Sequence, residues 1–313
     1  MDKAEKNSLI AIIKQASSVL APVPPPLPQK LETLRYAKLP RETRAVLFDV
    51  YGTLFCSAAG EISFAAKEDS LAQPGSLAQP GSLAQGGEKN DALEKLAKEY
   101  NLTGMEMRSF FKEQVAKIHS SLYMQTKWPE VNVEEIWTEF PGRQGFAKNI
   151  VLQGKAAREI ALRYELAVNP VYPMPGALKA IKGLQERRLV LGIISNAQFF
   201  TPLFFEAFFG APPEKLGFDP NLVIWSFEHR RAKPSPQLFQ IAADYLQTMG
   251  ITAGQCAFAG NDMLSDMYGA LNAGFKGILF AGDSRSLRLR ENDERLANLS
   301  VHMVIRKLEE LLV

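Results

Sequence analysis

The chain has 313 residues, of which 46% are hydrophobic and 22% are charged. That composition is typical of a globular protein long enough for one large core and a smaller companion domain. A formal net charge of only +2 gives no reason to expect nucleic acid or a membrane surface as a partner. Two isolated cysteines, Cys56 and Cys256, make neither a disulfide framework nor a zinc site. No apolar run is long enough for a membrane span or a secretory signal, so we expect a cytoplasmic protein.

The first 43 residues predict an appendage to the main fold. Apolar positions within residues 8–20 recur at the spacing of a short amphipathic helix. The proline-rich run from Ala21 to Pro28 predicts an extended, polyproline-like linker. This extension either binds a partner through its prolines or lies on the protein's own surface, and we favour the second because proline-rich linkers are common.

Residues 58–171 predict a helical region with one low-complexity loop. Between about residues 88 and 166, apolar residues recur at helical spacing in three segments, without a comparable strand signal. Within residues 70–87, the six-residue sequence Ser-Leu-Ala-Gln-Pro-Gly is repeated. Its period is far shorter than a solenoid unit of about 20–50 residues. Its low apolar content predicts a disordered loop without a catalytic role.

From residue 172 onward, strands alternate with helices. Continuous apolar runs predict buried strands at 45–48, 189–194, 222–225, 256–259 and 277–280, with an edge strand at 301–305. Such strands, separated by helices, predict an α/β fold with a parallel sheet covered on both faces.

Polar residues follow the predicted strands at the points where they end. Asp49 follows the first strand, and Ser195 and Asn196 end the second. Lys233 lies in the loop after the third strand, and Asn261 and Asp262 follow the fourth. Ligands of parallel sheets bind at the carboxyl ends of the strands. We therefore expect these groups to meet at one edge of the sheet and to form a site there.

These residue types favour nucleophilic chemistry on an anionic substrate. A carboxylate followed by a glycine-containing turn can attack phosphorus or carbon, while backbone N–H groups of the turn hold the anion. The Ser195 hydroxyl and Lys233 ammonium groups can bind the remaining oxygens and offset negative charge in the transition state. The carboxylates of Asp49 and Asp262 together would suit Mg²⁺.

Four segments of the sequence resemble the motifs of the haloacid dehalogenase (HAD) superfamily, in the family's order. They are Phe48–Leu54 (FDVYGTL), Ile193–Asn196 (IISN), Lys233–Phe239 (KPSPQLF) and Gly260–Asp266 (GNDMLSD). The resemblance implies a Rossmann-like core formed by residues 44–57 and 172–313, with a helical cap at 58–171. Residues 1–43 and the repeat lie outside it.

The resemblance also implies a set of functional residues and a small, anionic substrate. The expected catalytic residues are Asp49 as the nucleophile, Tyr51, Ser195 and Lys233. The expected substrate contacts are Gly52, Thr53 and Asn196. Gln198, which follows the second motif, is a further candidate contact, although an ordinary surface or packing role is favoured for it. The expected Mg²⁺ ligands are Asp49, the backbone carbonyl of Tyr51 and Asp262, with Asp266 supporting them and Asn261 as an alternative ligand.

Two departures from the family pattern leave three hypotheses open. Tyr51 replaces the second aspartate that protonates the leaving group in the phosphatases, whereas 2-haloacid dehalogenases have tyrosine there. Asn261 replaces the usual first acid of the fourth motif, although Asp262 and Asp266 retain the character of a Mg²⁺ site. We favour a Mg²⁺-dependent phosphate-ester hydrolase; the alternatives are a metal-free 2-haloacid dehalogenase and a weakly active or inactive HAD-fold interaction protein.

Other candidates carry weaker sequence support. Arg143, Gln144 and Arg158 are candidate substrate contacts from the cap, although ordinary surface or packing roles are favoured. His229 is a candidate replacement base because its reference pKa is about 6.5. The arginines Arg285, Arg288 and Arg290 are interspersed with acidic residues, which predicts a solvated surface of mixed charge.

Overall fold

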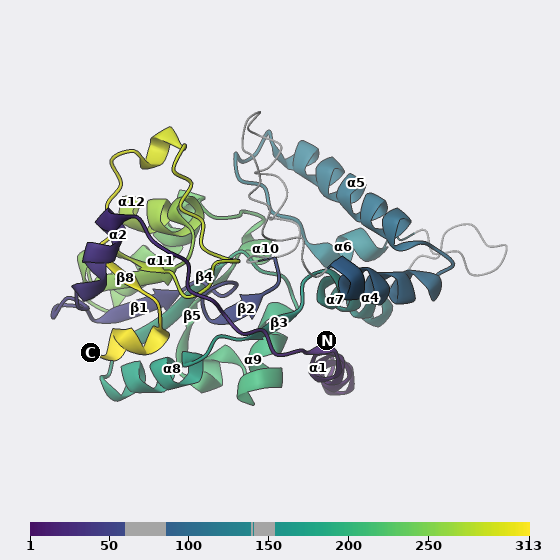
Figure 1. The fold of residues 1–313 in the computed structure, drawn as a ribbon, viewed down its shortest axis with the longest axis horizontal. Helices are drawn as coiled ribbons and strands as arrows, with labels where there is room; N and C mark the ends of the chain where they lie inside the picture. Colours follow the sequence, from purple (N-terminus) through teal and green to yellow (C-terminus); the bar gives the residue numbers. More distant parts are fainter. Residues whose placement is uncertain (60–85, 139, 141–153) are drawn as a thin grey trace.

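A six-stranded parallel sheet forms the centre of the protein (Figure 1). The computed structural model describes residues 1–59, 86–138, 140 and 154–313, so residues 70–85 of the repeat and the candidates Arg143 and Gln144 lie outside the description. The strand order is β5-β4-β1-β6-β7-β8. The strands are β1 (Ala45–Phe48), β4 (Val190–Ser195), β5 (Phe218–Trp225), β6 (Cys256–Gly260), β7 (Lys276–Phe280) and β8 (Met303–Ile305).

Strand β1 lies between β4 and β6, and this position determines where the site forms. Phe48 pairs with Ile193 of β4 on one side and with Ala259 of β6 on the other. The chain passes from β1 to β4 and β5, and then returns across β1 to β6. The strand order therefore reverses at the carboxyl end of β1, which is the position where open α/β sheets bind ligands.

Helices cover both faces of the sheet, as the apolar strands predicted. Val46 and Phe48 pack on the face covered by α8 (Ala177–Glu186), α9 (Thr201–Phe209) and a 3₁₀ helix at Leu308–Leu312. Ala45 and Leu47 face α11 (Pro236–Thr248), a π-helix at Met263–Tyr268 and α12 (Gly269–Asn272). The α/β prediction is confirmed, and the alternation along β1 divides the core into two apolar layers.

Several short elements were not predicted. Residues Phe55–Ser57 form β2, which pairs antiparallel with β3 (Val171–Pro173) where the chain leaves and rejoins the core. The remaining short helices are α2 (Gln29–Thr33), α10 (Ser226–His229) and 3₁₀ turns at Leu34–Tyr36, Pro213–Leu216, Ala253–Gln255 and Glu294–Leu296.

The described part of the region between β2 and β3, residues 86–138, 140 and 154–170, is mostly helical and has an aromatic core. Its helices are α4 (Gly86–Lys98), α5 (Gly104–Leu122), α6 (Val133–Thr138) and α7 (Lys155–Val168). Trp137 is fully buried, with ring centroids 5.8 Å from Phe111, 5.0 Å from Tyr164 and 5.1 Å from Phe140. We call this helical region the cap. None of the described helices is long and apolar enough to cross a membrane.

The amino-terminal helix, α1 (Lys3–Ala16), connects the cap to the core. It begins earlier than the expected residue 8, because the Asp2 side chain accepts a hydrogen bond from the Glu5 N–H at 2.8 Å and caps the helix. Glu5 pairs with Arg158 of the cap at 2.6 Å, and Lys6 pairs with Glu206 of α9 at 2.6 Å. In Figure 1, α1 lies below α7 and beside the core.

The proline-rich segment then crosses the core. The carbonyl of Val23 accepts a hydrogen bond from the N–H of Ser284 at 2.8 Å, and that of Ala21 accepts one from Arg285 at 2.9 Å. The carbonyl of Pro25 is contacted by Arg306 near β8 at 3.1 Å. The segment thus lies against the protein's own surface (purple trace in Figure 1).

Shortening a buried side chain of α1 should destabilise the whole protein. Ile13 is fully buried between the cap and the core, so Ile13→Ala should lower the free energy of unfolding by about 2–4 kcal/mol. Val19, which is 73% exposed, provides the matched control, and Val19→Ala should change it by less than about 0.5 kcal/mol. Urea denaturation measures both, and equal effects would show that α1 is not anchored as described.

Candidate active site

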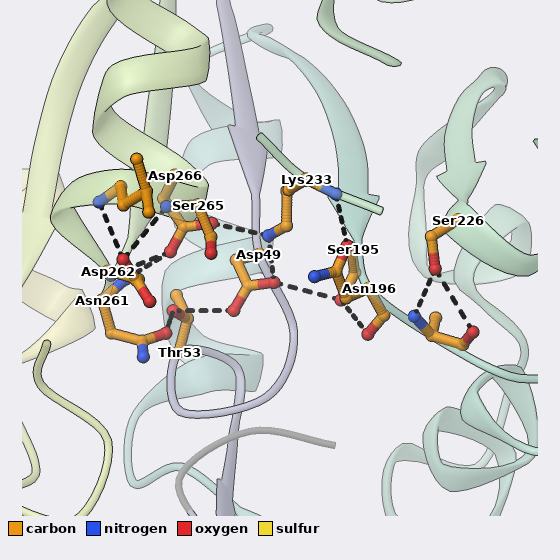
Figure 2. A network of polar contacts seen from close by, with 12 residues as sticks. Asp49, Thr53, Ser195, Asn196, Ser226, Lys233, Asn261, Asp262, Ser265 and Asp266 are labelled. Atoms are coloured by element: carbon orange, nitrogen blue, oxygen red, sulfur yellow. Dashed lines mark hydrogen bonds and ion pairs between the residues drawn. The ribbon is translucent and has the colours of Figure 1, made fainter. Parts of the chain in front are cut away.

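The carboxylate of Asp49 stands at the carboxyl end of β1 and is only 5% exposed. Its Oδ1 atom accepts hydrogen bonds from the Lys233 ammonium group at 2.6 Å and the Ser195 hydroxyl at 3.1 Å. Among the residues that the structure describes, its Oδ2 atom has one hydrogen-bond contact, a long one of 3.5 Å with the hydroxyl of Thr53. Figure 2 shows these partners around the carboxylate. One oxygen is therefore held firmly, whereas the other is available for chemistry.

Lys233 joins Asp49 to a second buried carboxylate, that of Asp266. Its ammonium nitrogen lies 2.6 Å from Asp266 Oδ1, and its side chain is 2% exposed. Burial by itself lowers the pKa of Lys233, but the charges of Asp266 and Asp49 outweigh this effect and raise it above the ordinary value. Lys233 therefore carries its charge at neutral pH.

Asp266 also fixes the loop that follows β6. Its Oδ2 atom accepts the N–H groups of Asn261 at 2.9 Å and of Asp262 at 3.0 Å. Because Asp266 is tied at one oxygen to Lys233 and at the other to the backbone, it positions both the cation and the loop.

The loop after β4 organises the other side of the site. The Asn196 side-chain oxygen accepts the backbone N–H of Lys233 at 2.7 Å, which orients the Lys233 loop. Gln198, a candidate substrate contact, instead bonds the cap: it donates to the carbonyl of Val131 at 2.8 Å and accepts the N–H of Val133 at 2.9 Å. The side-chain amide of Gln198 thus joins the core to the cap.

Asn261 faces the turn that follows β1. Its side-chain oxygen accepts the Thr53 hydroxyl at 3.0 Å, and its side-chain nitrogen donates to the carbonyl of Ser286 at 2.7 Å. The Ser286 hydroxyl donates to the carbonyl of Gly52 at 3.3 Å. Gly52 has φ +84°, a backbone conformation that favours glycine, and this turn brings Thr53 back beneath Asp49.

Asp262 has a different set of partners, which the sequence did not indicate. Its carboxylate accepts hydrogen bonds from Nε and Nη2 of Arg290, the shortest being 2.6 Å from Nη2 to Oδ2. It also accepts the N–H groups of Leu264 at 2.7 Å and Ser265 at 3.0 Å, capping the π-helix. The backbone of Arg288 bridges to Asp262 and brings Arg290 alongside it. Arg290 was expected on a solvated surface; this interpretation was wrong, because its side chain is 15% exposed and paired.

Loss of the Arg290 guanidinium group should destabilise this corner of the site. Arg290→Gln removes the charged partner of a 7% exposed carboxylate, so the free energy of unfolding should fall by about 2 kcal/mol. The control is Arg295→Gln, whose arginine pairs with Asp293 but is 43% exposed. Arg295→Gln should lower the free energy of unfolding by at most about 0.5 kcal/mol. Chemical denaturation measures both, and similar losses would contradict the assigned role of Arg290.

Tyr51 is packed into the core by its ring and held by its hydroxyl. The side chain is 3% exposed, and the hydroxyl lies 2.9 Å from the Thr201 hydroxyl at the start of α9. The Tyr51 ring meets that of Phe204 edge-on, with centroids 6.3 Å apart. Burial raises the pKa of Tyr51 well above its ordinary value, with smaller contributions in the same direction from Glu165 and Asp49.

One further candidate, Arg158, has partners outside the group around Asp49. Arg158 forms ion pairs with Glu5 of α1 and with Glu134 of α6, both at 2.6 Å. His229 ends α10, and burial, followed by the nearby charge of Arg231, lowers its pKa below the ordinary value.

The oxygen donors near Asp49 are of the kind that Mg²⁺ prefers. In the described part of the chain, no three His, Cys, Asp or Glu side chains converge on a possible metal position. The Asp49 carboxylate and the Asn261 side-chain oxygen both contact the Thr53 hydroxyl, at 3.5 and 3.0 Å, so one acidic and one neutral oxygen donor lie close together here. Mg²⁺ is commonly bound by only one or two carboxylates together with substrate oxygens and water, so this donor set fits it.

The chain belongs to the haloacid dehalogenase-like hydrolase family, whose model matches residues 43–274. The sheet topology and the meeting of the four motifs at one edge agree with this assignment. No curated protein matches the chain in sequence.

Solved structures of HAD-type enzymes resemble this fold at low sequence identity. A HAD phosphatase from Thermococcus onnurineus is 18% identical, with 86% of this chain and 96% of that chain covered and a TM-score of 0.48. An L-2-haloacid dehalogenase is 17% identical, with coverages of 86% and 97% and a TM-score of 0.48. A HAD-hydrolase of Bacillus subtilis bound to magnesium is 18% identical, with coverages of 86% and 96% and a TM-score of 0.44.

Proposed function

We propose that this hydrolase cleaves small phosphate monoesters through a covalent intermediate on Asp49, with Mg²⁺ bound beside it. The main support is the environment of the Asp49 carboxylate, whose Oδ1 atom is held by Lys233 at 2.6 Å and Ser195 at 3.1 Å. Those contacts fix the carboxylate in one orientation and leave Oδ2 with a single long contact. A fixed, partly free carboxylate oxygen at the ligand-binding end of the sheet is well suited to nucleophilic attack.

In the proposed reaction, Asp49 Oδ2 attacks the phosphorus atom of the ester. A bond forms between Oδ2 and phosphorus as the bond to the ester oxygen breaks, and that oxygen leaves with the electron pair. Water then attacks phosphorus as the bond from phosphorus to Oδ2 breaks, which restores the free carboxylate. The water oxygen keeps one proton on the product phosphate, and the other proton passes to a phosphate oxygen or to solvent. Lys233 offsets the negative charge of the phosphoryl oxygens, and the Ser195 hydroxyl group orients Asp49.

The proposed Mg²⁺ ligands are Asp49, the backbone carbonyl of Tyr51 and the side-chain oxygen of Asn261. Asn261 is preferred to Asp262 because the Asp262 carboxylate is engaged by Arg290 and by two backbone N–H groups. Mg²⁺, when bound, would screen the repulsion between the Asp49 carboxylate and an anionic phosphate. With one carboxylate among the proposed ligands, the metal should bind weakly until a substrate adds its own oxygens.

Displacement of halide from a 2-haloacid is the second candidate. It is favoured by Tyr51, whose position and contacts supply no acid for a leaving oxygen. A halide leaves as a stable anion and needs no proton, so Asp49 Oδ2 could attack carbon without an acid or a metal.

One set of assays distinguishes the candidates. Wild type and Asp49→Asn are given 4-nitrophenyl phosphate or 2-chloropropionate, each with Mg²⁺ or with EDTA. The proposal expects phosphate release that requires both Asp49 and Mg²⁺. Halide release that requires Asp49 and persists in EDTA would favour the second candidate. Failure of both substrates in every condition would contradict both and favour an interaction protein.

A further inference from the structure

The proposed reaction needs a way to stabilise the departing ester oxygen. When the bond from phosphorus to that oxygen breaks, the oxygen keeps the electron pair and is an alkoxide unless it receives a proton. An enzyme that acts on alkyl phosphates must supply that proton from a positioned acid or place a cation directly on the leaving oxygen. An enzyme with neither arrangement is restricted to leaving groups that are already stable as anions.

Tyr51 occupies the position two residues after the nucleophile, but its contacts direct the hydroxyl elsewhere. The hydroxyl is hydrogen-bonded to Thr201 at 2.9 Å, and Thr201 in turn accepts the N–H of Gln198 at 3.0 Å. The ring is packed against Phe204 and is only 3% exposed. Transfer of its proton to a substrate would require this buried arrangement to be broken.

The described side chains that touch Asp49 do not include another carboxylic acid. They are the hydroxyl groups of Thr53 and Ser195 and the ammonium group of Lys233. Lys233 is held between two carboxylates, those of Asp49 and Asp266, at 2.6 Å from each. These contacts suit Lys233 to a fixed positive charge rather than to a proton donor.

We propose that the substrates are phosphate monoesters whose leaving groups are stable anions, such as aryl or enol phosphates. This inference rests on the proposed phosphatase function and narrows its substrate class. The leaving group departs as a phenolate or enolate and takes its proton from solvent. Hydrolysis of the aspartyl phosphate then consumes one water molecule. Its OH group bonds to phosphorus as the bond to Asp49 breaks, and its second proton passes to the product phosphate or to solvent.

The test is a series of aryl phosphates whose phenols range from a pKa of about 10 to values several units lower. For the wild-type protein with Mg²⁺, kcat/KM should fall steeply, approaching about tenfold for each unit by which the leaving group becomes more basic. A nearly flat dependence would overturn the inference while leaving the phosphatase function intact. No turnover of any member would instead overturn the proposed function itself.

Two variants sharpen the interpretation of the slope. Tyr51→Phe keeps the ring and removes the hydroxyl, so its slope should equal that of the wild type; a steeper slope would identify Tyr51 as the acid and overturn the inference. Tyr51→Asp introduces an acid at this position and should raise turnover only for the most basic leaving groups. If Tyr51→Asp does not fold, the wild-type series and Tyr51→Phe still decide the question.

Discussion

Replacing Asp49 with asparagine should reduce kcat on an aryl phosphate by at least about 10⁴-fold, because the neutral amide removes the attacking oxygen. Asparagine has nearly the shape of aspartate, so it can still accept a hydrogen bond from Ser195 or Lys233 through its oxygen. Lys233 also keeps its ion pair with Asp266. The loss should therefore appear in kcat, while the fold is retained.

Steady-state kinetics measures this loss, and the thermal unfolding midpoint provides its control. The midpoint of Asp49→Asn should stay close to that of the wild type or rise, because one of two buried carboxylates around Lys233 becomes neutral. Activity within about tenfold of the wild type, in a properly folded variant, would show that Asp49 is not the nucleophile.

Replacing Lys233 with methionine should damage both stability and activity. The Lys233 ammonium group lies 2.6 Å from both Asp49 and Asp266, and without it the two buried carboxylates repel each other. The free energy of unfolding should fall by about 3–5 kcal/mol, the usual loss when one partner of a buried pair is removed. kcat should fall by about 10³-fold, because the charge on the phosphoryl oxygens is no longer offset.

The double variant Lys233→Met/Asp266→Asn separates the electrostatic effect from lost packing. Neutralising Asp266 removes one of the repelling charges, so the double variant should recover part of the lost stability. Lys179→Met, on the exposed side of α8, is the matched control and should change stability by less than about 0.5 kcal/mol. If Asp266→Asn lowers the stability of Lys233→Met by as much as it lowers that of the wild type, the two residues are not coupled.

The sheet could be predicted because its signal is local. A buried parallel strand must be apolar on both faces, so runs such as Val190–Ser195 and Lys276–Phe280 stand out in the sequence. The pair formed by β2 and β3 was missed because each strand is only three residues long and is defined by pairing across the inserted cap. Helix α9 was missed because its aromatic residues fill most of its surface and show little helical periodicity.

The polar groups of the site could be placed from the sequence because the ends of neighbouring parallel strands meet at one edge. The hydrogen-bond and ion-pair partners of those groups could not be predicted from the sequence. Arg290 lies 28 residues after Asp262, and Thr201 lies 150 residues after Tyr51. No local pattern links such pairs, since they meet only when a loop returns across the sheet edge. Because Arg290 engages the Asp262 carboxylate, Asn261 is the proposed metal ligand in its place.

The central claim is that the phosphoryl group passes through Asp49. Wild-type protein and Asp49→Asn are mixed with an aryl phosphate and Mg²⁺, quenched rapidly in acid and digested for peptide mass spectrometry. The account predicts one phosphoryl group on the wild-type peptide that contains Asp49, removed by hydroxylamine and absent from the variant. Rapid phosphate release with no modified peptide, or with the phosphoryl group on another residue, would contradict it.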